Sequence, residues 1–170
     1  LTVTKKDYFR MIEMKTGALF AAASGLAARI SGRDEAICEA MHGYGMKLGT
    51  AYQIYDDVVD IIGTEEVTGK TLGTDLEKGK LTLPILNLLD TATPKQKEKL
   101  TKRIIEQEPL DLHILGGIAD YEGAVDDALK TASQLVAEAR GSLSLLNASE
   151  YTTALEDITL YVDQLLKSCR

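Results

Sequence analysis

Cysteine is scarce in this sequence, and long apolar runs are missing from it. The two cysteines, Cys38 and Cys169, lie too far apart to form a clustered metal site or a dense disulfide framework. They favour a reducing compartment, so we expect a cytoplasmic protein. No segment reaches the ~20 consecutive apolar residues of a membrane helix, so no transmembrane segment is expected. Residues 1–6 also lack the basic and apolar regions of a signal peptide.

Positive charge is in deficit. The chain has 170 residues with 19 Lys and Arg against 26 Asp and Glu, which gives a formal net charge of -7. A strongly acidic chain is a poor candidate for binding nucleic acid, and we expect no such partner. An anionic ligand would need a local group of basic side chains or a bridging cation.

The alternation of apolar and polar residues that marks strands is absent over any useful length. The chain instead shows helical periodicity and recognisable helix starts. Thr4 and Asp7 form one capping pair, and Thr93, Pro94 and Gln96 form another. We predict helices over residues 7–30, 34–62, 94–106, 118–146 and 150–168. The predicted fold is an all-α helical bundle, in a single domain over residues 1–170.

The segment GTEEVTGKTLGTDLEKGKLT, residues 63–82, differs from its surroundings. It contains glycines at positions 63, 69, 73 and 79 among Thr, Lys and acidic residues, with little apolar content. We predict a polar loop of about twenty residues, a length at which loops in compact domains are commonly functional. A plain connector is the alternative.

The most informative stretch is GTAYQIYDDVVD, residues 49–60. Four polar residues are spaced i, i+3, i+4 and i+7 and so share one helical face: Gln53, Asp56, Asp57 and Asp60. A separate apolar face is formed by Ile54, Val58 and Ile61. A hard divalent cation would relieve the repulsion between the carboxylates, and Mg²⁺ commonly bridges such carboxylates to phosphates. The pattern therefore indicates a metal site, with a solvated acidic face as the alternative.

Basic and small residues surround this acidic face in the sequence. Lys15 lies in the first predicted helix, and Lys70 and Lys80 each follow a glycine in the polar loop. Lysines beside a carboxylate–Mg²⁺ group are what a diphosphate requires, because metal and ammonium share the neutralisation of its charge. A surface charge is the alternative for each lysine alone.

Glycines inside a helix cost about 1 kcal/mol each relative to Ala and usually mark close helix approach. The second predicted helix contains three of them: Gly43, Gly45 and Gly49. The first contains a similar set of small residues: Ala21, Ala22, Ala23, Gly25, Ala27 and Ala28. We therefore expect the two helices to lie close together, with Lys15 near the acidic face.

Together, YGMKLGTAYQIYDDVVD and TGKTLGTDLEKGKLTLPIL closely resemble the second aspartate-rich region of trans-isoprenyl diphosphate synthases. This family includes farnesyl, geranylgeranyl, octaprenyl and solanesyl diphosphate synthases. The upstream EMKTGALF resembles the family's Lys-Thr helix. The resemblance covers essentially the whole chain, with its motif core between Lys15 and Pro84.

The resemblance implies an all-α isoprenoid-synthase fold, homodimeric in the complete protein. It also implies Mg²⁺-dependent, or Mn²⁺-dependent, head-to-tail condensation of isopentenyl diphosphate with an allylic diphosphate, which yields a (poly)prenyl diphosphate. The metal ligands that it implies are Asp56, Asp57 and Asp60. The residues implied to bind the substrate diphosphate are Lys15, Lys70 and Lys80. Gln53 and Thr16 are implied to lie near the developing allylic cation, Gln53 also contacting substrate.

The sequence departs from the family pattern in two ways. Tyr52 replaces the usual Phe before the glutamine, which is a mild change. The first aspartate-rich motif and the arginines that follow it are absent. The remaining Asp-Asp pair, Asp126 and Asp127, lacks a third acid because residue 130 is Lys. We therefore expect the C-terminal half of a synthase, inactive when isolated and contributing the allylic diphosphate and Mg²⁺ half-site. A non-catalytic subunit of a heteromeric synthase, or a helical bundle without transferase activity, are the alternatives.

Overall fold

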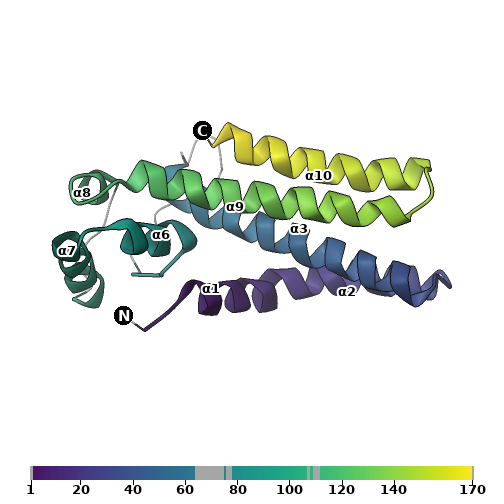
Figure 1. Cartoon of the computed structure of the whole chain (residues 1–170), viewed down its shortest axis with the longest axis horizontal. Coiled ribbons are helices and arrows are strands. Elements are labelled where there is room, and N and C mark those ends of the chain that lie inside the picture. The colour runs from purple at the N-terminus through teal and green to yellow at the C-terminus, as the bar shows by residue number, and fades with distance from the viewer. Residues whose placement is uncertain (1, 64–74, 76–77, 107, 109–111, 170) are drawn as a thin grey trace. The chain divides into compact units, whose positions relative to one another are not determined.

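The computed structural model describes residues 2–63, 75, 78–106, 108 and 112–169. These residues form helices and no strand, so the predicted all-α class is confirmed (Figure 1). They divide into two compact units. The first unit comprises Leu1–Tyr8, Asp56–Lys130 and Cys169, and the second comprises Phe9–Tyr55, Thr131–Ser168 and Arg170. Among the described helices, none combines the length and apolar character needed to cross a membrane.

The first unit contains the start of α1 (Lys5–Ile12), the end of α3 (Glu35–Ile62) and several shorter helices. These are α6 (Leu83–Thr91), α7 (Pro94–Ile105), α8 (Leu112–Gly116) and the start of α9 (Tyr121–Ser142). Every side chain of α6 from Leu83 to Leu89 is buried, as expected for a helix that is apolar all round. Its polar member, Asn87, donates a 3.0 Å hydrogen bond to the carbonyl of Ala124, so α6 packs against α9.

Both predicted helix starts of this unit carry the expected caps. The amide of Asp7 donates to Oγ1 of Thr4 (3.2 Å), and the amide of Thr4 donates to Oδ2 of Asp7 (3.0 Å). Thr93 and Gln96 form the same reciprocal pair at α7. Each box satisfies amide groups that a helix start leaves without intrahelical partners. The start of α1 is thereby fixed at Lys5.

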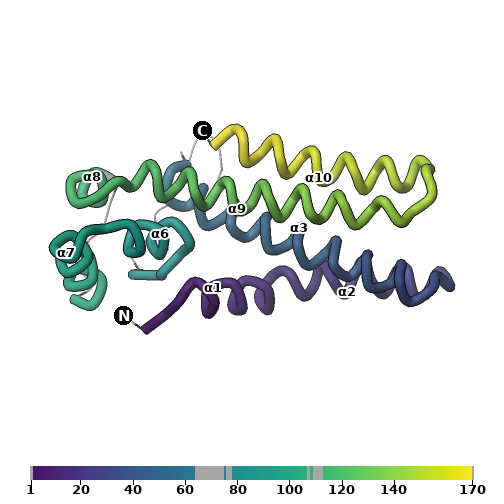
Figure 2. The backbone as a smooth tube through the Cα atoms, in the orientation of Figure 1, coloured from purple at the N-terminus to yellow at the C-terminus, as the bar shows by residue number. Residues whose placement is uncertain are grey.

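The second unit contains the π-helical turn η1 (Glu13–Gly17), α2 (Ala18–Ile30), most of α3, the end of α9, the 3₁₀ turn η2 (Leu143–Leu145) and α10 (Glu150–Ser168). Within this unit α9 and α10 lie side by side (Figure 2), and Nε of Arg140 donates to Oγ1 of Thr159 between them (2.9 Å). The phenol of Tyr44 joins α3 to α10 by donating to the carbonyl of Leu155 (2.9 Å).

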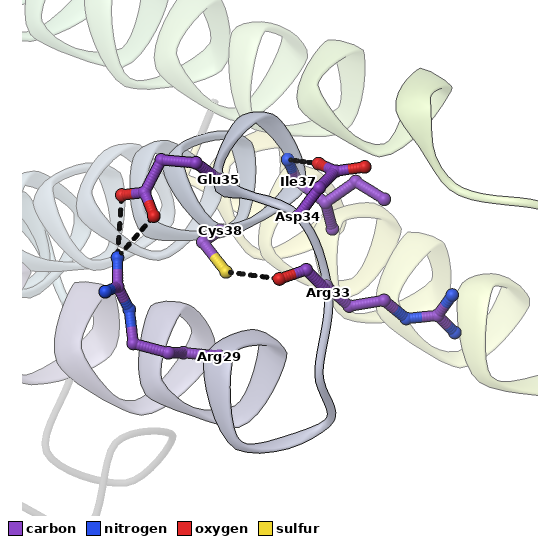
Figure 3. A network of polar contacts seen from close by, with 6 residues as sticks. All are labelled: Arg29, Arg33, Asp34, Glu35, Ile37 and Cys38. Atoms are coloured by element: carbon purple, nitrogen blue, oxygen red, sulfur yellow. Dashed lines mark hydrogen bonds and ion pairs between the residues drawn. The ribbon is translucent and has the colours of Figure 1, made fainter.

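The turn between α2 and α3 is shown in Figure 3. Oδ1 of Asp34 accepts a hydrogen bond from the amide of Ile37 (2.9 Å), so α3 begins at Glu35 with Asp34 as its cap. Nη2 of Arg29 donates to both carboxylate oxygens of Glu35, at 2.6 and 2.8 Å. These contacts fix the angle at which the chain leaves α2.

Small residues bring α2 and α3 together, as the sequence predicts for Gly45 and Gly49. A Cβ built on Gly49 would lie 3.0 Å from Cα of Gly17, and one built on Gly45 would overlap the carbonyl of Phe20. Gly43 is different, because a Cβ there would meet nothing within 4 Å. The prediction that Gly43 also marks close packing is therefore wrong.

The sequence pattern does not predict α6 or α8, and it overextends α9. An apolar run as short as LPILNLLD does not by itself distinguish a helix from another buried segment. The helix predicted over residues 118–146 is observed as Tyr121–Ser142 followed by the 3₁₀ turn. By contrast, α10 has its predicted bounds.

Candidate functional site

Thr16 and Gln53 meet in the second unit. Oγ1 of Thr16 donates a 2.6 Å hydrogen bond to Oε1 of Gln53, although the two residues are 37 positions apart. Gln53 is 5% exposed and lies on α3, whereas Thr16 is half-buried on η1. Because the amide oxygen accepts this bond, the orientation of the Gln53 side chain is set by Thr16.

Lys15 lies beside Thr16 on the same π-helical turn and is exposed. Single π-turns within helices are rare and occur often at functional sites, because the extra residue redirects the side chains around it. The turn comprises EMKTG, which is the motif that the sequence singles out. Gly17 ends this turn and is buried, with its position for a Cβ only 2.9 Å from Oγ1 of Thr50.

The three aspartates of the predicted acidic face lie in the first unit, on the last two turns of α3. Asp56 and Asp60 are half-buried, whereas Asp57 is only 6% exposed. Val58 and Ile61 are buried, which confirms that this end of α3 has a separate apolar face. The acidic face is therefore not uniformly solvated.

Tyr8 explains how the Asp57 carboxylate is accommodated in the interior. The phenol of Tyr8, itself 1% exposed, donates a 2.7 Å hydrogen bond to Oδ2 of Asp57. Burial raises the pKa of Tyr8 well above its usual value, and the charge of Asp57 raises it further. The phenol therefore stays protonated and serves as a donor to a carboxylate, which is a charge-assisted hydrogen bond.

Asp60 is joined to a lysine through Asp75. The backbone amide of Asp75 donates to Oδ2 of Asp60 (2.9 Å), and Nζ of Lys80 donates to Oδ1 of Asp75. The hydrogen bond with Asp75 raises the pKa of Lys80, and the charges of Asp57 and Asp60 act in the same direction. Lys80 is therefore a stable cation within the field of the acidic face.

The structure thus brings together part of the predicted site in each unit. The first unit holds Asp56, Asp57, Asp60 and Lys80, and the second holds Lys15, Thr16 and Gln53. Lys70 lies outside the described residues.

Sequence reasoning did not assign Tyr8 or Asp75 to this site. Asp75 lies in the GTDLEKGK string, five residues before Lys80. This short separation of opposite charges is the signal by which their pairing could have been predicted. Tyr8 is a single aromatic residue near a helix start, 49 positions from its partner, and no pattern marks it.

The atoms that the acidic face offers to a metal ion are carboxylate oxygens, which suit Mg²⁺ or Mn²⁺. Within the described residues, no group of three or more His, Cys, Asp or Glu lies close enough to hold a metal ion by itself. Mg²⁺ does not require such a group, because it is usually bound by one or two carboxylates together with waters and substrate phosphates. Asp56 and Asp60, which are half-buried at the end of α3, fit that kind of binding.

The chain is similar to known proteins in both sequence and structure. The family model described as "Polyprenyl synthetase" matches residues 1–115. A geranylfarnesyl diphosphate synthase of Natronomonas pharaonis is 34% identical over 158 residues, which is 92% of this chain and 45% of that protein.

The fold of the chain is also similar to solved structures of prenyl diphosphate and polyprenyl synthases. The decaprenyl diphosphate synthase of Rhodobacter capsulatus superposes with a TM-score of 0.85 at 28% identity, over 99% of this chain and 52% of that one. The polyprenyl synthase of Caulobacter crescentus, solved with calcium and isoprenyl diphosphate, superposes with a TM-score of 0.84 at 32% identity, over 95% and 50%. The chain therefore spans about half the length of these relatives.

Proposed function

This chain belongs to the polyprenyl synthetase family, and from that we propose that it contributes the allylic-diphosphate and metal half-site of a prenyl diphosphate synthase. The proposed reaction is the head-to-tail condensation of isopentenyl diphosphate with an allylic diphosphate. The observation that carries the proposal is the hydrogen-bonded group in the first unit, where Asp60, Asp75 and Lys80 combine carboxylate oxygens with a cation.

In this reaction the C–O bond of the allylic diphosphate breaks, and the diphosphate leaves with the electron pair. The double bond of isopentenyl diphosphate then attacks the allylic cation, a C–C bond forms, and a proton is lost to the departing diphosphate. The groups that a protein must supply are therefore cations for the leaving diphosphate and a polar, uncharged environment for the carbocation.

The residues of this chain fit those requirements in the following roles. We propose that Asp56 and Asp60 bind Mg²⁺, which neutralises charge on the diphosphate when bound. Lys80 is proposed to bind this diphosphate. Lys15 and Lys70 are proposed to bind substrate diphosphate from their places in the family motif. Gln53, oriented by Thr16, presents a dipole without net charge towards the allylic cation.

The chain spans about half of its relatives, so the isopentenyl diphosphate site is proposed to come from residues outside this sequence. The chain alone is then expected to bind diphosphate without catalysing condensation. A homodimeric and cytoplasmic complete protein remains part of the proposal. A non-catalytic subunit would instead bind no diphosphate and would act only through its partner.

Calorimetric titration of inorganic diphosphate tests the proposal, with and without Mg²⁺. The test variant is Asp56→Asn/Asp60→Asn, which changes the two proposed metal ligands. The matched control is Asp126→Asn/Asp127→Asn, which removes the same charge from an exposed pair on α9. We expect Mg²⁺-dependent binding in the wild type and in the control, and its loss in the test variant. Absence of Mg²⁺-dependent binding in the wild type, or equal loss in both variants, contradicts the proposed half-site.

A further inference from the structure

Tyr8 and Asp57 form a buried polar pair that the condensation chemistry does not by itself require. The phenol and carboxylate oxygens are 2.7 Å apart, and the two residues are 1% and 6% exposed. A buried polar group without a hydrogen-bond partner is costly, and the phenol of Tyr8 supplies a donor to the Asp57 carboxyl group. The pair therefore holds one carboxylate of the acidic face in a defined orientation.

Both members of the pair are held by their own surroundings. Tyr8 follows the Thr4–Asp7 capping box directly, and its amide donates to the carbonyl of Thr4 (3.0 Å). Asp57 precedes the buried Val58 on α3. The Tyr8 and Asp57 side chains are therefore ordered before a ligand binds, and they lose little further conformational entropy on binding.

We infer that Tyr8 is a positioning residue for the diphosphate and metal site, acting through Asp57. This inference rests on the proposed function, because it assigns Tyr8 to that same site. The oxygen of Asp57 that faces Tyr8 is committed to the interior, so Asp57 orients the acidic face and Asp56 and Asp60 are its more exposed carboxylates. Groups that orient ligands in this way typically change metal affinity by about 10- to 100-fold when removed.

The chain contains a matched control for a purely structural role. Tyr44 is also buried, at 3% exposed, and its phenol donates a 2.9 Å hydrogen bond, but to the carbonyl of Leu155 and not to a carboxylate. Tyr8→Phe and Tyr44→Phe each remove one buried hydroxyl. Loss of stability is expected from both, whereas an effect on metal-dependent binding is expected from Tyr8→Phe alone.

The test measures inorganic diphosphate binding to the full 170-residue chain by calorimetry in saturating Mg²⁺ and in its absence. We expect Tyr8→Phe to weaken Mg²⁺-dependent binding about 10-fold, and Tyr44→Phe to leave it unchanged. The electron paramagnetic resonance spectrum of bound Mn²⁺ should also broaden in Tyr8→Phe and not in Tyr44→Phe. Equal affinities in all three proteins, or equal weakening by both substitutions, overturn the inference.

A second pair of variants keeps the test decisive if Tyr8→Phe does not fold. Tyr8→4-aminophenylalanine retains an N–H donor, whereas Tyr8→4-fluorophenylalanine fills a similar volume without one. Binding near the wild-type level in the first and about 10-fold weaker in the second supports the inference. Identical binding in the two overturns it. A wild-type chain without Mg²⁺-dependent binding is a different result, since it contradicts the proposed function and removes the inference with it.

Discussion

Oγ1 of Thr16 lies 2.6 Å from Oε1 of Gln53 and donates its hydrogen to it. This short bond joins η1 to α3 in the second unit. Because the side-chain amide of Gln53 is planar, fixing its oxygen also fixes the orientation of its nitrogen. The two residues that we propose to lie near the allylic cation are thus joined by a hydrogen bond.

The Thr16–Gln53 bond predicts a measurable coupling energy. Thr16→Val removes the donor with little change in shape, and Gln53→Leu removes the acceptor. Each single change should cost about 1 kcal/mol in the free energy of unfolding, because the Thr16–Gln53 hydrogen bond is lost. In a double-mutant cycle by denaturant unfolding, the pair should show a coupling of about 1 kcal/mol. Strictly additive effects would show that the bond does not form in solution.

Gly45 and Gly43 should respond to alanine in opposite directions. A Cβ on Gly45 overlaps the backbone carbonyl of Phe20, whereas a Cβ on Gly43 meets nothing within 4 Å. Gly45→Ala should therefore destabilise the protein by about 1–3 kcal/mol through overpacking. Gly43→Ala should stabilise it by about 0.5–1 kcal/mol, since alanine is the better helix former. Denaturant midpoints of the two variants measure both effects, and the same sign for both would contradict the close approach of α2 and α3.

Stability should fall at high pH because of buried tyrosines. Burial raises the pKa of Tyr44 from 10.0 to about 12. A raised folded-state pKa means that the unfolded chain loses its proton first, so the stabilising contribution is complete below pH 10 and decreases between pH 10 and 12. Tyr44→Phe should reduce the slope of the unfolding free energy against pH in this window. Tyr161→Phe, at an exposed position on α10, is the control and should leave the slope unchanged.

Lys80 should matter for diphosphate binding more than an ordinary lysine. Lys80→Met removes a cation that is linked through Asp75 to Asp60, and under the proposed function it should weaken Mg²⁺-dependent diphosphate binding by about 10-fold or more, as expected for a charged hydrogen bond.

Lys130→Met is the comparison for Lys80→Met. Lys130 forms a 2.9 Å ion pair with Asp127 on the exposed side of α9, in the same unit as Lys80. We expect this variant to bind diphosphate as the wild type does. Calorimetric titration at two ionic strengths measures both effects, and similar losses in the two variants would mean that net charge alone is responsible.

The sequence predicts the helices of this chain better than the contacts between them. Periodicity identifies α3 and its apolar face, because the burial of Ile54, Val58 and Ile61 follows from spacing along one helix. The burial of Asp57 could not be read in this way, since it depends on a hydrogen bond with Tyr8, 49 positions away. A carboxylate on an acidic face looks solvated until its partner is known.

The same reasoning applies to the polar segment before α6. The GTDLEKGK string does not reveal that the amide of Asp75 reaches Asp60, because that contact joins residues 15 positions apart. The apolar run of α6 is equally ambiguous in sequence, and the fold assigns it to a helix by packing Asn87 against Ala124. Residues defined by distant contacts are therefore the ones that sequence reasoning misses.

The glycines at the contact of η1 and α2 with α3 also fix the register of these helices, that is, their relative position along their axes. If α3 slid by one turn, about 5.4 Å, either Gln53 would face Gly17 or Met41 would face the carbonyl of Phe20. Neither side chain fits where the present contacts admit no Cβ. The glycines thus set the register at which Thr16 meets Gln53. A mutational survey of substrate binding should therefore include Gly17 and Gly49.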